Sequence, residues 1–245
     1  MVRVLLRWLG ILAGWAELVP LTGLLWLLAF LPLPRRIYRA LFRHWSRVWV
    51  AALGVELRLH QHNLHPLPPV YLMIANHPSA FEDIGIPALF DVDSLAKAEV
   101  RHWPIVGRIS AAAGTLYVRR ESRESRREAA QAIRRHLEGG RSVALYPEGG
   151  VKGMRVHPFR YGAFAISLDT GIPIVPVFIH YEAQRDFYWD REPLPLKLWQ
   201  IMRAANPVAN YHLFDAVDPA EFTDKESYCA ALQQRYREWQ ARYLD

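Results

Sequence analysis

The chain is poor in features that would place it in several common classes of protein. It has one cysteine, Cys229, so an intrachain disulfide and a thiolate metal cluster are both excluded. It has no Gly-x-Ser-x-Gly motif, and Cys229 falls within a predicted C-terminal helix, so covalent catalysis has no obvious nucleophile. It also lacks internal repeats and low-complexity linkers. A chain of 245 residues is long enough to bury the core of one domain with a short appendage.

Net charge is absent from most of the chain. Residues 51–245 contain 23 basic and 23 acidic residues, so the formal charge of +6 lies within residues 1–50, where seven arginines oppose Glu17. A nucleic-acid-binding domain usually carries its basic patch on the folded body, so no nucleic-acid partner is predicted. The basic excess flanks the most apolar part of the chain, which indicates a bilayer containing anionic lipids.

Basic residues are also missing from the apolar run over residues 9–34, which contains one acid, Glu17. As a helix this run is long enough to cross a hydrocarbon core of about 30 Å. A cleaved signal peptide is disfavoured, because no small-x-small site follows the run. Two interpretations stay open: a single transmembrane helix, or a re-entrant or two-helix monotopic insertion, which Pro20, Gly23 and the charge of Glu17 favour.

A basic stripe follows the apolar run. It has helical spacing and consists of Arg36, Arg39, Arg43 and Arg47. The stripe predicts either a solvated helix face or an interfacial helix whose arginines meet lipid phosphates. We therefore expect residues 1–53 to form a membrane anchor with an amphipathic basic helix, and residues 54–245 to form the main domain. If the anchor spans, the arginine bias places that domain at the cytoplasmic face, and a bacterial inner membrane is the expected location.

From residue 54 onward, short β-rich runs alternate with helical patterns. The expected strands cover residues 55–60, 70–75, 94–97, 115–119, 142–146 and 174–180. The expected helices cover residues 81–90, 122–137, 159–169 and about 224–243. This alternation predicts an α/β fold with a mostly parallel sheet and helices on its faces. Residues 182–210, rich in proline and tryptophan, are interpreted as an inserted loop.

Three loops that follow predicted strands carry unusual polar residues. They contain Asn76-His77-Pro78-Ser79-Ala80-Phe81-Glu82-Asp83, then Arg119-Arg120, then Tyr146-Pro147-Glu148-Gly149-Gly150-Val151-Lys152-Gly153. Ligands of such sheets bind at the carboxyl ends of the strands. A histidine with a carboxylate partner can act as a general base toward a hydroxyl group. A structural alternative also exists, because Ser79-x-x-Glu82 has the pattern of a helix capping box.

The spacing His60-x-His62-x-x-His65 could suggest a metal site. This segment falls at a strand end and in a proline-rich loop, without cysteines or paired carboxylates, so no metal is predicted.

At the three loops the sequence resembles the glycerolipid acyltransferases of the lysophosphatidic acid acyltransferase type. Their blocks read Asn-His-x-Ser-x-x-Asp, Gly-x-x-Phe-Ile-x-Arg and Phe-Pro-Glu-Gly-Thr-Arg-Ser. They are matched in order by segments 76–82, 114–120 and 146–152, and a Phe-Lys-x-Gly-Ala-Phe block and a Val-Pro-Ile-x-Pro-Val block are matched by segments 159–164 and 172–177.

The resemblance implies an αβα layered fold preceded by membrane-associated helices. It implies that His77 acts as the base, with Glu82 or Asp83 as its partner, since Glu82 stands where the family has aspartate. The substrate-binding residues that it implies are Asn76, Ser79, Arg120, Tyr146, Pro147, Glu148, Gly149, Arg160 and Pro173, the last in the acyl site. A guanidinium such as that of Arg120 also suits bidentate phosphate binding.

The implied reaction moves a fatty acyl group from acyl-CoA or acyl carrier protein to the free hydroxyl of a lysophospholipid, with no cofactor. One departure bears on the acceptor. Gly150-Val151 replaces the family's Thr-Arg, so one phosphate-binding cation is missing and Lys152 or Arg155 is left to replace it. If neither does, a lyso-aminolipid such as lyso-ornithine lipid becomes the alternative acceptor, and a non-catalytic lipid-binding protein is a further alternative.

Overall fold

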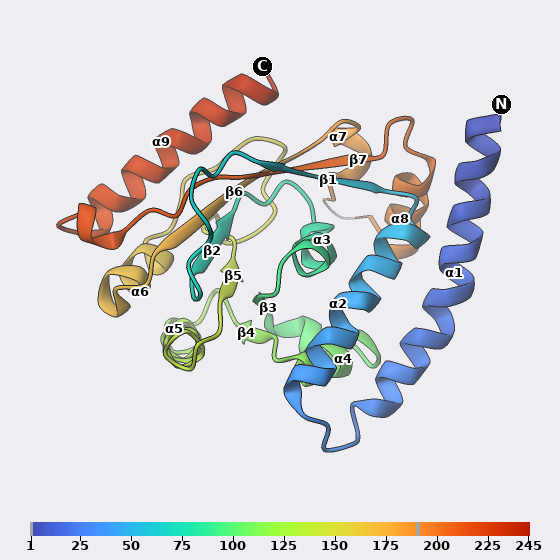
Figure 1. Cartoon of the computed structure of the whole chain (residues 1–245), viewed down its shortest axis with the longest axis horizontal. Coiled ribbons are helices and arrows are strands. Elements are labelled where there is room, and N and C mark those ends of the chain that lie inside the picture. The colour runs from blue at the N-terminus through green and yellow to red at the C-terminus, as the bar shows by residue number, and fades with distance from the viewer. Residues whose placement is uncertain (1, 190–191) are drawn as a thin grey trace.

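The computed structural model describes residues 2–189 and 192–245 and shows one sheet between two layers of helices (Figure 1). The strands are β1 (Glu56–Gln61), β2 (Leu72–Ala75), β3 (Asp93–Lys97), β4 (Leu116–Val118), β5 (Val143–Leu145), β6 (Ile174–Tyr181) and β7 (Val208–Leu213). Their order in the sheet is β1-β7-β6-β2-β5-β3-β4. Every pairing is parallel except that of β6 with β7. The predicted α/β fold with a mostly parallel sheet is confirmed.

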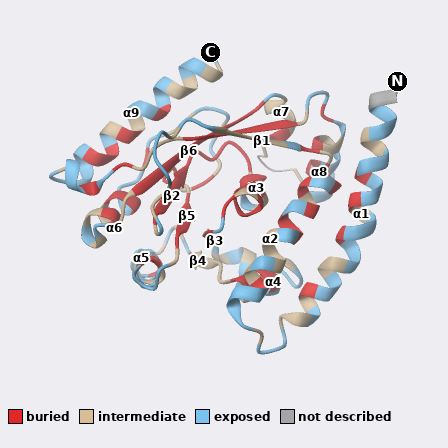
Figure 2. Cartoon of the chain, in the orientation of Figure 1, coloured by how far each residue is buried: buried red, intermediate tan, exposed pale blue. Residues whose placement is uncertain are grey.

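Alternate residues of a strand point to opposite faces of the sheet, and each face is covered by its own layer of helices. Within β2, Leu72 and Ile74 belong to a core shared with α5, α6 and α9, whereas Met73 and Ala75 belong to a core shared with α2, α3 and α8. The helices are α1 (Val2–Leu28), α2 (Arg35–Ala52), α3 (Glu82–Leu89), α4 (Val106–Ala113), α5 (Arg123–Glu138), α6 (Gly162–Thr170), α7 (Gln184–Phe187), α8 (Leu194–Arg203) and α9 (Lys225–Tyr243). Figure 2 shows the central strands buried between these two layers. Such burial on both faces is typical of parallel sheets.

The first two helices form an antiparallel hairpin beside the body (Figure 1). By length and composition, residues Val4–Leu28 could cross a membrane. One side of α1 nevertheless packs on the protein, where Ile11, Leu18 and Leu25 are buried at intervals of seven residues. The other side exposes a stripe of large apolar residues: Leu5, Leu9, Leu12, Val19, Leu24 and Leu27. One side of α1 therefore packs against the body of the protein, and its other side presents an exposed apolar surface.

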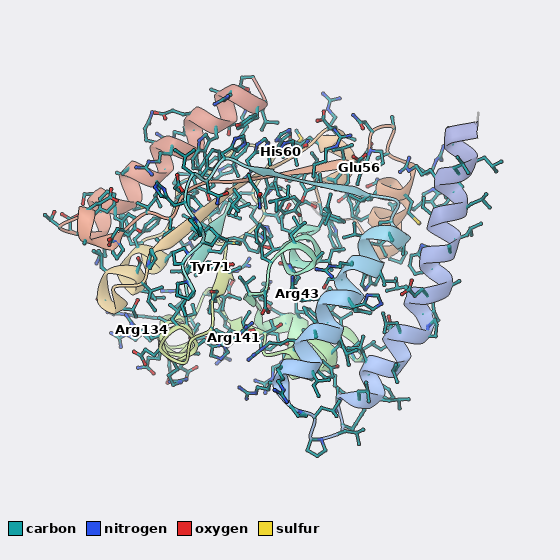
Figure 3. The ribbon with its side chains drawn as sticks, viewed as in Figure 1. Arg43, Glu56, His60, Tyr71, Arg134 and Arg141 are labelled. Atoms are coloured by element: carbon teal, nitrogen blue, oxygen red, sulfur yellow. The ribbon has the colours of Figure 1, made fainter. Side chains whose placement is uncertain are left out.

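The arginine stripe of α2 is divided between the protein and solvent: Arg39 and Arg47 contact the body, whereas Arg36 is exposed at the hairpin turn. Arg39 Nε lies 3.2 Å from Asp93 Oδ1, and Arg47 Nε donates to the carbonyl of Ala88 at 2.9 Å. Asp93 also accepts a hydrogen bond from Arg141 (Figure 3, where both Arg141 and Arg43 are labelled). These contacts lie at the amino edge of the sheet, where β3 begins. The buried Asp93 explains the difference, because an unpaired carboxylate there would be strongly destabilising.

The prediction that residues 182–210 form an inserted loop is wrong. This part of the chain contains α7, α8 and the beginning of β7, which pairs with both β1 and β6. All six residues of β7 are buried, although residues 209–213 alternate apolar and polar side chains, which is the sequence signal that indicates this strand.

Candidate active site

The carboxyl ends of three parallel strands bring the predicted polar loops together. His77 follows β2, Arg120 follows β4, and Tyr146 follows β5, which pairs directly with β2. The ring of Tyr146 stacks on the ring of His77 with a centroid separation of 3.9 Å and an interplanar angle of 6°. The parallel pairing is therefore what places residues about seventy positions apart in direct contact.

His77 is paired with Glu82 rather than with Asp83. Its Nδ1 lies 2.7 Å from Glu82 Oε2, and both side chains are almost fully buried. Glu82 begins α3, so the turn from Pro78 to Phe81 folds its carboxylate back onto the imidazole. Asp83, the next residue, is exposed. An imidazole that donates Nδ1–H to a carboxylate presents its Nε2 as the basic nitrogen, and none of the described residues hydrogen-bonds to that Nε2.

Burial sets the protonation of this pair. It lowers the pKa of His77 to about 4, and the nearby positive charge of Arg120 acts in the same direction, whereas Asp83 and Glu148 oppose it. His77 is therefore neutral at pH 7, as a general base must be. Burial raises the pKa of Glu82, opposed by hydrogen bonds donated by the Tyr181 hydroxyl and by the Ser79 amide. Tyr181, at the end of β6, carries no local sequence signal and was not predicted.

Three predicted substrate-binding side chains instead hold the loops in place. Glu148 accepts from the amide of His77 at 2.9 Å and from the amide of His157 at 3.0 Å, so it ties two loops together. Asn76 exchanges two hydrogen bonds with the backbone of Ile179. Ser79 Oγ donates to the carbonyl of Phe187 at 2.6 Å. Burial raises the pKa of Glu148 to about 6. The polar atoms of these side chains are hydrogen-bonded within the protein, and their assignment to substrate binding stays a prediction.

An apolar cavity of about 180 Å³ opens beside the loop of residues 76–83. We call it the α2–α8 cavity, and it is lined by Trp45, Trp49, Phe81, Ile84, Val106 and Ile201 among others. Its wall also includes Ser79 and Asp83, so it reaches the turn that holds His77. Apolar walls with few polar groups suit an aliphatic chain. The residues of α2 that line this cavity were not predicted as part of the site.

A second hollow of about 540 Å³ lies between α5 and α6. This α5–α6 groove is lined by Arg120, Arg126, Arg160, Tyr146, Pro147 and Gly149, with Ala129, Ile133 and Ala163 among its apolar residues. Five predicted residues from three segments of the chain therefore meet in one place: Arg120, Tyr146, Pro147, Gly149 and Arg160. Arg126 lies within α5 and was not predicted.

Two predicted residues lie elsewhere. Pro173 precedes β6, and its carbonyl accepts from the amide of Leu72 at the start of β2. Because β2 and β6 are parallel, Pro173 is at the opposite edge of the sheet from His77, and its assignment to an acyl site stays a prediction. Lys152 is exposed and does not line the α5–α6 groove. Arg155, the other candidate for the missing cation, pairs with Asp245 at 2.6 Å.

The three histidines near residue 60 are engaged in separate contacts. Nε2 of His60 contacts Asn210 Oδ1 at 2.9 Å, and Nε2 of His62 contacts His212 Nδ1 at 2.9 Å. His65 lies apart, beside Asp215. Across the described ranges, no group of three or more His, Cys, Asp or Glu residues could hold a metal ion.

The site therefore consists of a buried His–Glu pair at the carboxyl edge of a parallel sheet, with an apolar cavity and an arginine-lined groove beside it. The sequence matches the Acyltransferase family over residues 58–180, and the chain belongs to that family. It is 32% identical over 204 residues to the lyso-ornithine lipid O-acyltransferase of Pseudomonas aeruginosa, covering 80% of this chain and 77% of that protein.

Two further relatives define the range of similarity. The 1-acyl-sn-glycerol-3-phosphate acyltransferase of Neisseria gonorrhoeae is 26% identical over 177 residues, covering 69% of each chain. The crystal structure of the 1-acyl-sn-glycerophosphate acyltransferase PlsC of Thermotoga maritima superposes with a TM-score of 0.69 at 20% identity, covering 100% of this chain and 99% of that one. The shared fold thus includes the N-terminal hairpin.

Proposed function

We propose that the chain transfers a fatty acyl group from acyl-CoA or acyl carrier protein to the free hydroxyl of a lysolipid with an anionic head group. The contact of 2.7 Å between His77 and Glu82 carries this proposal, because it holds a neutral imidazole with Nε2 available as a base. The family membership and the names of the relatives support the class of reaction.

In the proposed mechanism, the acceptor hydroxyl donates its proton to Nε2 of His77 while its oxygen attacks the thioester carbonyl carbon. Glu82, hydrogen-bonded to Nδ1, stabilises the imidazolium that forms. The carbon–sulfur bond of the tetrahedral intermediate then breaks, and the imidazolium returns its proton to the departing thiolate. No step requires a covalent enzyme intermediate. This agrees with the burial of Cys229, where burial raises the thiol pKa to about 11.

The two hollows suit the two ends of a lipid. The α2–α8 cavity takes an acyl chain, and the α5–α6 groove takes the anionic head of the acceptor, near Arg120 and Arg160. The acceptors named for the relatives share this chemistry, with a phosphate in one and the carboxylate of ornithine in the other. The replacement of Thr-Arg by Gly150-Val151 and the similarity to the Pseudomonas protein favour testing lyso-ornithine lipid alongside 1-acylglycerol-3-phosphate.

The function is tested with purified protein in detergent. We expect a diacyl product, detected by mass spectrometry, from at least one of these two lysolipids with acyl-CoA or acyl carrier protein as donor. Absence of product from every combination would contradict the proposal. Release of free fatty acid without an acceptor would indicate a hydrolase instead.

We propose further that the protein lies on one leaflet rather than spanning the bilayer. Arg7 donates to the carbonyls of Ala204 and Met202 at 2.7 and 2.8 Å, and Trp26 donates to the carbonyl of Pro104 at 3.2 Å. Because both ends of α1 are tied to the body, a perpendicular span would draw polar parts of the body into hydrocarbon. The exposed Arg35 and Arg36 at the hairpin turn suit the anionic cytoplasmic leaflet.

The double substitution Leu9→Glu and Leu12→Glu tests this attachment. Both side chains are more than half exposed on the apolar stripe of α1, so two charges there should abolish most sedimentation with anionic vesicles. The control is Leu64→Glu, which changes an apolar side chain with 86% exposure in the loop after β1 and should sediment as the wild type does. Equal sedimentation of the α1 variant and the wild type would contradict attachment through this stripe.

A further inference from the structure

The α5–α6 groove gathers three arginines, and its lining residues include no carboxylate. Arg120 comes from the loop after β4, Arg126 from the first turns of α5, and Arg160 from the segment before α6. Among residues 2–189 and 192–245, no carboxylate forms an ion pair with any of these three guanidinium groups. Several positive charges that line one hollow attract an anion, so the groove suits an anionic ligand.

The backbone around the groove is shaped to admit these side chains. A Cβ atom on Gly149, whose φ is +78°, would lie 2.7 Å from Arg160 Nε. A Cβ atom on Gly150 would lie 2.8 Å from Arg120 Nη1. The two glycines therefore leave room for guanidinium groups beside the loop, and at position 150 this is room that the threonine of related sequences would fill.

Arg126 is fixed toward the same point. Its Nη1 donates to the carbonyl of Arg120 at 2.6 Å, which orients the guanidinium along the backbone of the loop that carries Arg120. Arg126 and the neighbouring Arg127 are both exposed, but only Arg126 lines the groove. Because Lys152 and Arg155 lie outside the groove, Arg126 is the cation in position to replace the arginine that Val151 removes from the third motif.

We propose that Arg126 is a specificity-determining residue that completes a three-arginine site for the anionic head group of the acceptor. This inference rests on the proposed acyl transfer. The groove belongs to the acceptor because it includes Tyr146, whose ring stacks on His77, so a head group bound there keeps its hydroxyl within reach of the base. The site recognises an oxyanion, either the phosphate of a lysophosphatidate or the carboxylate of a lyso-aminolipid.

The test compares Arg126→Gln with Arg127→Gln, a matched loss of charge one residue away. Initial rates are measured against acceptor concentration, with 1-acylglycerol-3-phosphate and with lyso-ornithine lipid, and separately against donor concentration. We expect Arg126→Gln to raise the KM for the preferred acceptor about ten-fold while kcat and the donor KM stay within about two-fold of wild type. Arg126→Lys, which keeps the charge but loses the planar fork, should fall between the two. The acceptor with the larger response identifies the oxyanion.

Equal kinetics of the Arg126→Gln and Arg127→Gln variants would overturn the proposal, and so would a rise confined to the donor KM, which would assign the groove to the donor. A second measurement does not depend on turnover: inorganic phosphate, compared with sodium chloride at equal ionic strength, should raise the unfolding temperature of wild type and Arg127→Gln more than that of Arg126→Gln. If the wild-type protein transfers no acyl group, the proposed function is wrong. The phosphate measurement still shows in that case whether Arg126 belongs to an anion-binding site. An equal phosphate response in all three proteins would refute that site.

Discussion

Substitution of His77 by alanine is expected to lower kcat for acyl transfer by about 10² to 10⁴-fold, because the acceptor hydroxyl loses the group that takes its proton. His77 is the imidazole whose Nδ1 is held by Glu82, so no neighbouring histidine can replace it without moving a loop. The measurement is single-turnover acyl transfer at saturating donor and acceptor, which separates the chemical step from binding.

The control for this variant is His65→Ala. The side chain of His65 is 81% exposed, lies beside Asp215 and is remote from the catalytic loop, so its loss should leave turnover within about two-fold of wild type. Far-ultraviolet circular dichroism and the unfolding temperature show whether either variant is misfolded. Unchanged turnover in a folded His77→Ala protein would end the general-base mechanism.

The parts of the site that the sequence predicted are those whose partners are close along the chain or follow a strand end. His77 and Glu82 are five residues apart, so one turn decides their contact. The loops after β2, β4 and β5 meet because parallel strands align their carboxyl ends. All six predicted strands are present, with bounds shifted by at most two residues.

The parts that were missed depend on packing between distant elements. Tyr181 reaches Glu82 only because β6 lies beside β2. Arg126 enters the groove only because α5 packs against α6, and it reads in the sequence as one of several arginines on a solvated helix. The position of Pro173 has a related cause. Its motif is recognisable in the sequence, but the edge of the sheet at which it lies depends on where β6 begins. Strand pairing and helix packing, rather than local pattern, set these positions.

Substitution of Glu82 by glutamine is expected to lower kcat by about 10²-fold or more with little change in the acceptor KM. The amide can no longer hold Nδ1–H and stabilise the imidazolium in the way that a carboxylate does. Glu82→Asp should retain more activity than Glu82→Gln, because the carboxylate remains and related sequences carry aspartate at this position. Asp83→Asn is the matched comparison one residue away, and the 2.7 Å contact made by Glu82 predicts the smaller effect for Asp83. A larger loss from Asp83→Asn than from Glu82→Gln would reverse the assignment.

The pH profile shows whether Glu82 positions the imidazole or only shields it from water. Burial lowers the pKa of His77 to about 4, and the base acts in its neutral form, so wild-type kcat/KM should stay level at neutral pH and fall only as the pH drops through about 4. Glu82→Gln removes a group that favours the imidazolium. The plateau of kcat/KM in this variant should therefore be lower than in the wild type, and its acidic limb should not shift to higher pH. A limb that moves up toward the ordinary histidine value of about 6.5 would show that the ring has become hydrated, and the orienting role of Glu82 would then be wrong. Burial also raises the pKa of Glu148 to about 6 and raises the pKa of Asp83, so each carboxyl group can add an acidic limb, and Glu148→Gln and Asp83→Asn identify their contributions.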